Sequence, residues 1–231
     1  MFRLKANEPH SQVDLSSFWI PYSDLMAALL GIFALLLLVT IYRLGEPLDE
    51  VKKILEERDA IVKELQDSFE GDKGIQVTES GSIRLKDNIL FRFNDDELQE
   101  EGKRALLAVM PEYLDALSRH ETFRAHLDRI LIEGHADSVG GYLYNLKLSQ
   151  RRASSVVEFL LTCDELLDYR SFMQTYFLAS GRSSTDPVFD ENTLQVDNDR
   201  SRRIQIDFRM DDTRLVKELI EKVEIRKAGP R

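Results

Sequence analysis

Residues 132–160 read IEGHADSVGGYLYNLKLSQRRASSVVEFL, and this stretch decides the fold of the C-terminal half of the chain. Its apolar start predicts a strand that ends at Gly134, and a polar, glycine-containing loop then carries Asp137. From about Asn145 the apolar residues take a helical spacing, which predicts a helix. Arg152 falls on the same face of that helix as Asn145, two turns further on.

We expect Asp137 in the loop to approach Arg152 on the helix. A guanidinium group can fork onto the carboxylate of a ligand while an aspartate accepts from its ammonium group. The two residues therefore predict a site for a ligand that carries both charges. A structural ion pair between Asp137 and Arg152 explains the same residues, and the spacing alone leaves both interpretations open.

The sequence on either side predicts an α+β sandwich, in which short strands alternate with helices. β-patterned runs occur at residues 75–77, 82–85, 129–133, 176–179 and 203–208. Helical patterns occur at residues 99–119, 146–163 and 212–223. In the last of these, Leu215, Leu219 and Val223 share a face and are expected to pack as core.

A second stretch, residues 18–42, is apolar over about 25 residues, enough to cross a hydrocarbon layer of roughly 30 Å. We expect a transmembrane helix that stays attached, because a signal peptide has a shorter apolar run and a small-residue cleavage site. Basic residues on its two sides nearly balance. The small size of the arm, residues 1–17, favours a cytoplasmic N-terminus and a periplasmic C-terminal part at a bacterial inner membrane.

Asp24 is the one charged side chain in this span. Placing an ionised carboxylate in a bilayer costs roughly 2.5–3.5 kcal/mol even on the mildest scales, so such a residue predicts a function, here carrying H+ or Na+. A lone carboxylate makes no complete path, so a partner protein must supply the rest. The alternative is a hydrated group near the interface, or a helix cap beside Ser23.

After the span, apolar residues recur at alternating spacings of four and three, at Leu44, Leu48, Val51, Leu55, Val62, Leu65 and Phe69. This heptad register predicts a parallel two-stranded coiled coil over residues 43–70, and hence a homodimer. An amphipathic helix that lies on its own domain explains the same spacing. Gly71 and Gly74 are expected to end the helix.

The composition excludes several classes of function. The 231 residues carry a net charge of −10, so no basic field is available for the phosphates of DNA or RNA. The four histidines lack metal-ligand spacing, and no nucleophile and base have a recognisable setting, so we expect no metal, no cofactor and no enzyme activity. The single cysteine, Cys163, is expected to be a buried thiol or to cross-link two copies.

The stretch from residue 132 resembles the OmpA-like peptidoglycan-binding domain. The residues that carry the resemblance are Gly134, His135, Asp137, Gly140, Asn145, Leu148, Ser149, Arg152 and Ala153. Further matches are residues 88–93 (NILFRF), which resemble the first long strand of the family, Gly181 with Pro187, and residues 198–206 (NDRSRRIQI). Two positions depart from the family pattern: Ala136, where Thr is common, and Ser201, where Asn is common. The resemblance predicts a domain at residues 75–210, followed by a helix and tail at 211–231.

The resemblance implies a role for five residues. Asp137 and Arg152 would hold the diaminopimelate of a peptidoglycan stem. Tyr144, Asn145 and Leu148 would form the adjacent wall of the site.

The order of parts, a span with the acid in YSDLMAALL, a helix and an OmpA-like domain, resembles the B subunit of ion-driven stators of the MotB type. Within that family it is most similar to the B subunits of Zorya anti-phage defence complexes. The resemblance implies a B homodimer inside a ring of five MotA-like A subunits, with Asp24 driving rotation and the chain acting as sensor and transmitter. A flagellar-type stator subunit and a passive tether between inner membrane and cell wall are the alternatives.

Overall fold

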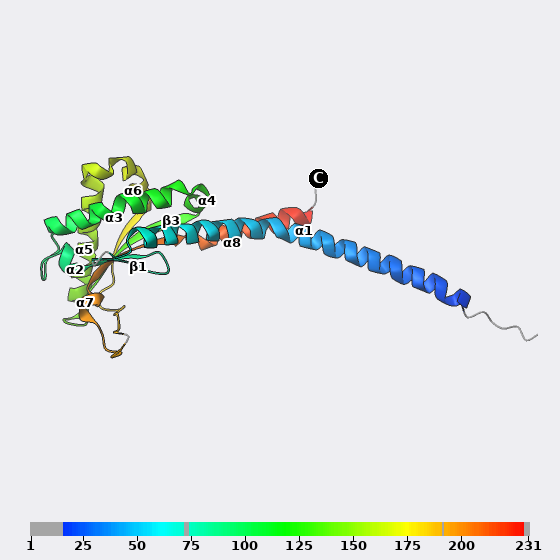
Figure 1. The fold of residues 1–231 in the computed structure, drawn as a ribbon, viewed down its shortest axis with the longest axis horizontal. Helices are drawn as coiled ribbons and strands as arrows, with labels where there is room; N and C mark the ends of the chain where they lie inside the picture. Colours follow the sequence, from blue (N-terminus) through cyan, green and yellow to red (C-terminus); the bar gives the residue numbers. More distant parts are fainter. Residues whose placement is uncertain (1–15, 72–73, 191, 229–231) are drawn as a thin grey trace, which may run out of the picture. The chain divides into compact units, whose positions relative to one another are not determined.

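The computed structural model describes residues 16–71, 74–190 and 192–228. Most of the predicted arm, residues 1–15, lies outside them. The chain divides into two units, one of residues 50–221 and one of residues 1–49 with 222–231. The first helix, α1 (Ser16–Ser68), contributes to both units (Figure 1).

Within the N-terminal unit, α1 contains one segment that is long and apolar enough to cross a membrane. This segment, Pro21–Tyr42, has 22 residues and a mean hydropathy of 2.6. It matches the span predicted from the sequence, and its large apolar side chains are exposed. By length and composition it is the candidate membrane span among the described residues.

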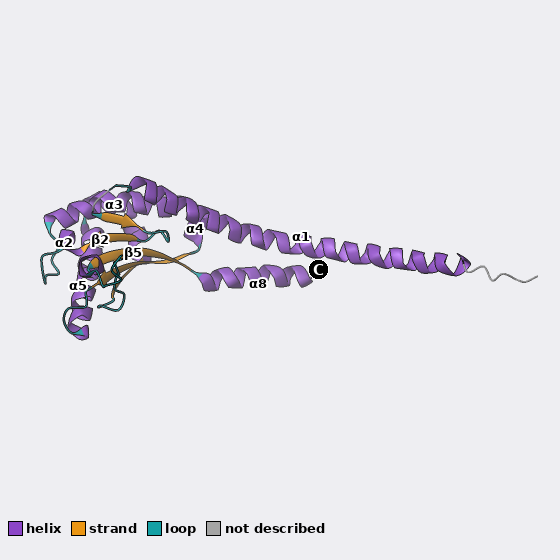
Figure 2. Cartoon of the chain, turned by 60° about the horizontal axis from the view of Figure 1, so that its bottom comes forward, coloured by secondary structure: helices purple, strands orange, loops and turns teal. Residues whose placement is uncertain are grey.

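The second unit is built on a five-stranded sheet in the order β1-β2-β5-β3-β4. Its strands are β1 (Ile75–Val77), β2 (Ile83–Lys86), β3 (Leu127–His135), β4 (Phe177–Gly181) and β5 (Arg203–Met210). All neighbours are antiparallel except β3 and β4, which run parallel. Figure 2 shows the strands as a single layer. The mixed α/β fold predicted from the sequence is confirmed.

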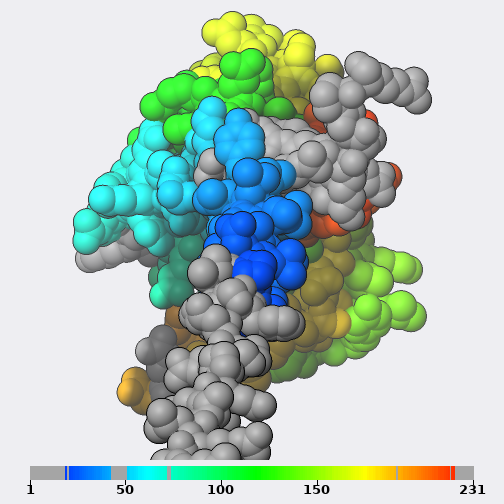
Figure 3. Space-filling model, turned by 90° about the vertical axis from the view of Figure 1, so that its right-hand side faces the viewer, coloured from blue at the N-terminus to red at the C-terminus, as the bar shows by residue number. Residues whose placement is uncertain are grey.

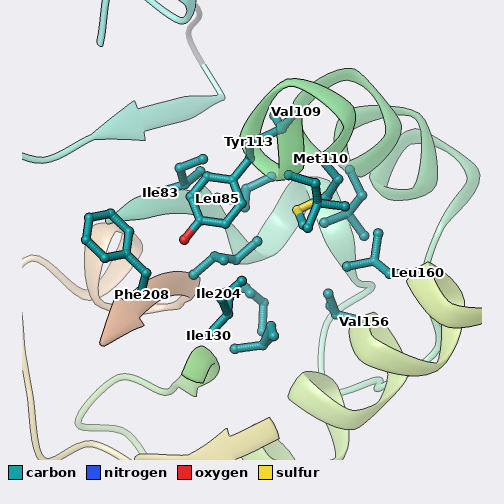
Figure 4. Close-up of a cluster of buried hydrophobic side chains, with 14 of the residues drawn as sticks. Ile83, Leu85, Val109, Met110, Tyr113, Ile130, Val156, Leu160, Ile204 and Phe208 are labelled. Carbon is teal, nitrogen blue, oxygen red and sulfur yellow. The ribbon is translucent and has the colours of Figure 1, made fainter. Parts of the chain in front are cut away.

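Two long helices, α3 (Glu100–Arg119) and α5 (Tyr142–Thr162), bury their apolar faces against this sheet. Figure 4 shows Tyr113 and Met110 from α3 and Val156 and Leu160 from α5 turned toward strand residues such as Ile204. The shorter helices are α2 (Asp87–Leu90), α4 (Glu121–Ala125), the 3-10 helix η1 (Asp164–Tyr169), α6 (Arg170–Tyr176), α7 (Asn198–Ser201) and the C-terminal α8 (Asp212–Ala228). In Figure 3 the segment of η1 and α6, in yellow, lies above α3, in green.

Two predictions about single elements are wrong. Residues 88–93 form no long strand: α2 occupies Asp87–Leu90, and Phe91 makes only an isolated bridge with Leu98. The backbone N–H of Phe91 donates to the carbonyl of Asp87 at 2.8 Å and closes this turn, despite the β-forming residues in the stretch. The helix α5 begins at Tyr142, earlier than expected, directly after Gly141.

The C-terminal helix α8 meets the domain through polar contacts. His126 Nε2 and Glu218 Oε2 are 3.0 Å apart, and Arg214 donates to the carbonyl of Ala125 at 2.8 Å. Leu215 is only half-buried and lies outside the main core cluster, so the prediction of core packing is wrong there. The side chains of Leu219 and Val223 lie outside the described residues.

The second half of the predicted coiled-coil linker packs on its own domain. Ile61, Val62 and Leu65 are buried members of the hydrophobic core, and Phe69 packs against it. The predicted intermolecular seam is therefore wrong from Val62 onward, because the chain's own domain covers it. Leu55, an earlier seam position, is 51% exposed, and the side chains of residues 43–50 lie outside the described part.

Polar contacts fix this part of α1 in place as well. The carboxylate of Glu57 accepts from the backbone N–H of Phe123 at 2.8 Å, and so caps the first turn of α4. Arg119, at the end of α3, donates to Glu64 at 2.9 Å. The helix that leads away from the membrane segment is thus part of the domain fold from about residue 54.

We expect Leu65→Ala to lower the free energy of unfolding by roughly 2–5 kcal/mol, the usual cost of a cavity in a packed core. The measurement is chemical denaturation of the detergent-solubilised chain, followed by circular dichroism. Leu55→Ala is the matched control and should leave unfolding unchanged. Equal effects of the two substitutions would contradict the packing described here and favour a seam that uses both residues.

Candidate functional site

Two glycines allow α5 to lie directly on the ends of β3 and β4. Gly134 and Gly181 are register partners on the two parallel strands. A Cβ on Gly134 would lie 2.1 Å from the carbonyl oxygen of Ser149, and one on Gly181 would lie 2.6 Å from the backbone nitrogen of Gln150. Only glycine permits this approach, which places the first turns of α5 beside the loop after β3.

A cavity of about 420 Å³ lies between that loop, α2 and the start of α5. We call it the ligand cavity. All five residues predicted for the site line it: Asp137, Tyr144, Asn145, Leu148 and Arg152. The loop and the helix therefore converge as the sequence predicts, and the structure assigns no ligand to the cavity.

Arg152 is buried at one side of the ligand cavity and is held by four groups. Its Nη1 forms an ion pair with Asp87 at 2.9 Å, its Nε donates to the carbonyl of Asp95 at 2.8 Å, and its Nη2 donates to that of Arg92 at 3.4 Å. The guanidinium carbon lies 5.1 Å from the centre of the Phe91 ring. An arginine has five N–H donors, and two of those of Arg152 are bonded to backbone carbonyls. The contact with Asp87 is an ion pair without a hydrogen bond, so the other N–H groups of Arg152 are available to a ligand.

Asp137 has a different partner. Its Oδ2 accepts from Arg202 at 2.5 Å, and its Oδ1 accepts from the backbone N–H of Val139 at 3.0 Å. Asn145 donates to the carbonyls of Asp137 and Val139, at 3.3 and 3.0 Å, and so fixes the loop. Among the described residues Asp137 and Arg152 form no ion pair with each other, so the structural pairing considered for them is wrong.

The mouth of the ligand cavity is apolar and aromatic. Phe93 is 97% exposed and Val139 68% exposed, and both line the cavity. The hydroxyl of Tyr144, on the first turn of α5, donates to Asn94. A ligand that enters would exchange water for these rings while its charged end reaches Arg152.

Burial also changes the ionisation of two groups near the site. It raises the pKa of Asp87 to about 6, although Arg152 and Arg202 oppose the change. It lowers the pKa of His135 to about 3, with further lowering by Arg203. His135 is therefore neutral at neutral pH, and its two ring nitrogens have no hydrogen-bond partner among the described residues.

Sequence reasoning missed three residues of the site. Asp87 and Arg202 hold Arg152 and Asp137, and Phe93 stands at the mouth. Phe93 and Arg202 fall within stretches 88–93 and 198–206, which carry the family resemblance, and Asp87 directly precedes the first. The position of these three residues in or beside the matched stretches is the signal that could have identified them. A strand at 88–93 would not bring Asp87 and Phe93 to the site, whereas the helix and loop that form there do.

The ligand cavity lies in a part of the chain that is similar to a known family. A family model described as the OmpA family matches residues 90–202. This part of the chain is an OmpA-like domain. This OmpA domain contains all five predicted site residues, from Asp137 to Arg152.

Relatives match more of the chain than the OmpA domain. The Zorya protein ZorB of Escherichia coli strain ATCC 8739 is 27% identical over 207 residues, covering 80% of this chain and 85% of the relative. ZorB of Escherichia coli O139:H28 is 28% identical over 201 residues, covering 82% and 78%. A crystal structure of a putative MotB-like protein from Desulfovibrio vulgaris is 20% identical, covers 70% of this chain and 95% of its own, and has a TM-score of 0.46.

The two departures of the OmpA domain from the family pattern have structural roles of their own. Ser201 is fully buried: its hydroxyl donates to the carbonyl of Asp197 at 2.6 Å and accepts from the backbone N–H of Val188 at 3.0 Å. These bonds fix α7 next to Arg202. Ala136 is buried, and its N–H donates to the carbonyl of Ser183 at 2.8 Å.

The raised pKa of Asp87 gives a signed prediction. Because its pKa is higher in the folded chain than the ordinary value of 3.8, the contribution of Asp87 to stability is full below that value and is lost as pH rises through about 6. The free energy of unfolding of wild type relative to Asp87→Asn should therefore fall by roughly 2.4 kcal/mol between pH 4 and pH 7. Urea denaturation at several pH values measures this difference.

Asp96→Asn is the control, since Asp96 forms an exposed ion pair with Arg151. Its stability difference from wild type should change little over the same range. A flat difference for Asp87→Asn would show that folding leaves the pKa of Asp87 unchanged and would contradict the expected effect of its burial.

Proposed function

We propose that this chain is the B subunit of a ZorB-type, ion-driven motor of the bacterial inner membrane, anchored to peptidoglycan and acting in anti-phage defence. Two copies stand within a ring of five MotA-like A subunits, the N-terminus is cytoplasmic and the OmpA domain periplasmic. The main support is the similarity to ZorB over 80% of the chain, because that share exceeds the OmpA domain and includes residues outside it.

The chemistry of the ligand cavity supports binding to peptidoglycan. Diaminopimelate is an amino acid, so it offers a carboxylate and an ammonium group together. The N–H groups of Arg152 that are not bonded to backbone carbonyls suit the carboxylate, and Asp137 can share its charge between Arg202 and the ammonium. Phe93 and Tyr144 would cover the apolar part of the stem at the mouth.

The membrane segment supports the transport of H+ or Na+. Asp24 shares a helix face with Ala27, Ala28 and Gly31, at spacings of three, four and seven residues. A Cβ on Gly31 would meet nothing within 4 Å. Small residues let a neighbouring transmembrane helix approach closely, so a partner helix can complete the ion path beside the carboxylate.

The proposal is tested by purifying the detergent-solubilised chain with the proteins encoded beside it, and by scoring phage plaques and swimming motility in cells that lack it. Recovery of a multi-span partner, with loss of phage protection and normal swimming, is the expected result. Loss of swimming alone would favour a flagellar stator subunit. Recovery of no partner and no change in either readout would favour a passive tether.

A further inference from the structure

A second cavity, of about 360 Å³, is lined by residues of β1, β2 and the start of β5, and it shares Arg202 with the ligand cavity. Five cationic side chains line it: Arg84, Lys86, Arg200, Arg202 and Arg203. We call it the basic cavity. None of the described residues that line it carries a carboxylate. The lining of the basic cavity is therefore strongly positive, although the chain as a whole has a net charge of −10.

Pairing of the strands brings these cations together. In the antiparallel register of β2 and β5, Arg84 stands opposite Gln205, and Lys86 stands opposite Arg203. Like charges directly opposite each other on neighbouring strands destabilise a sheet. Asp186 offsets the charge of Arg203, and an anion bound on this face of the two strands would offset the charges of Arg84 and Lys86.

Two of the five cations have carboxylate partners. Arg203 is almost fully buried and forms an ion pair with Asp186 at 2.7 Å. Arg202 pairs with Asp137 at 2.5 Å and also with Asp199. These two side chains are therefore fixed in place at the edge of the cavity.

The other three cations are unmatched within the described part of the chain. Arg84 donates its Nε to the neutral amide oxygen of Gln205 at 3.1 Å, and Arg203 shares the same acceptor at 3.2 Å. Lys86 and Arg200 form no ion pair with any described residue. Three positive charges with free donors thus face one cavity.

We propose that the basic cavity binds a phosphate group. A free phosphate carries up to two negative charges and a phosphodiester carries one, and both offer several acceptor oxygens to the three unpaired cations. The planar forks of Arg84 and Arg200 suit bidentate binding to such oxygens, and Lys86 adds a point charge. Two sources carry this chemistry: free phosphate, and the phosphodiester of an anionic lipid headgroup.

The test is isothermal titration calorimetry on the full chain in neutral detergent micelles, at constant ionic strength. One arm titrates sodium phosphate, and the other titrates short-chain phosphatidylglycerol against short-chain phosphatidylcholine. We expect saturable binding in at least one arm. Binding of inorganic phosphate assigns the free ion, and binding of phosphatidylglycerol alone assigns a lipid headgroup.

The variants are Lys86→Gln and Arg200→Gln, which lie at the cavity surface and remove no ion pair. Each should weaken binding about tenfold or more, the usual loss for a hydrogen bond between charged groups. Arg124→Gln is the control, because it removes the same charge from a residue that does not line the basic cavity. Arg124 lies on α4, just before the start of β3. The proposal is overturned if wild type binds neither probe, or if Lys86→Gln and Arg200→Gln both bind as wild type does.

Discussion

Asp24→Asn should abolish the biological activity of the chain while leaving its complex intact. Asparagine has almost the same shape as aspartate but carries no charge, so it cannot take up and release H+ or Na+. The cost of an ionised group in the bilayer, roughly 2.5–3.5 kcal/mol at least, also disappears, so assembly should not suffer. The measurement combines co-purification of the variant with its partner and plaque counts on cells that express both.

Ser23→Ala is the matched control for this experiment. Ser23 is the neighbour of Asp24 on α1, and its replacement removes a polar group without touching the carboxylate. It should keep plaque counts at the wild-type level. Full protection by Asp24→Asn would refute an ion-carrying role, and loss of the complex in both variants would show that this part of the helix serves assembly.

The strands and the ligand cavity could be predicted because short-range patterns encode them. Four of the five strands have alternating or β-branched residues, β4 begins with the aromatic Phe177, and a turn signal lies at the end of each. Asn145 and Arg152 fall on one face of a helix by spacing alone. Glycines such as Gly134 mark where the helix must approach the sheet. Each of these patterns involves residues that are close in the sequence, so it can be recognised without knowledge of the tertiary fold.

The partners of the site residues could not be predicted in the same way. Asp87 precedes Arg152 by 65 residues, and Asp137 precedes Arg202 by the same number. Which acid meets which arginine depends on how α2 and α7 sit at the sheet ends, and spacing carries no such information. The sequence predicts that Asp137 and Arg152 lie close together, but in the structure Arg152 pairs with Asp87 and Asp137 pairs with Arg202.

Net charge and heptad spacing predict less about the surfaces of this chain for a related reason. Each is a property of a whole sequence segment, whereas the fold places its residues on different faces. A net charge of −10 argues against binding to DNA or RNA, but it does not reveal that pairing of β2 with β5 gathers Arg84, Lys86 and Arg203 on one face. In the linker, the heptad spacing predicts an apolar face that can pack either on a second helix or on the chain's own domain. Ile61 and Leu65 are buried in the domain core, so this face packs on the domain.

Arg152→Lys should lower binding to isolated peptidoglycan by about tenfold to a hundredfold. Lysine keeps the positive charge beside Asp87, so no buried carboxylate is left unpaired, but it lacks the planar fork that can donate to a ligand carboxylate. Each charged hydrogen bond lost is worth roughly 1.5–3 kcal/mol. The measurement is sedimentation of the detergent-solubilised chain with purified sacculi over a range of sacculus concentrations, together with the unfolding temperature.

Arg151→Lys gives a control on the adjacent residue. Arg151 is exposed and pairs with Asp96 at 3.2 Å on the outer face of α5, away from the ligand cavity. Its replacement should leave both binding and unfolding temperature unchanged. Wild-type binding by Arg152→Lys would exclude a bidentate contact with the ligand, whereas weaker binding at an unchanged unfolding temperature would show that the guanidinium of Arg152 contacts the cell wall directly.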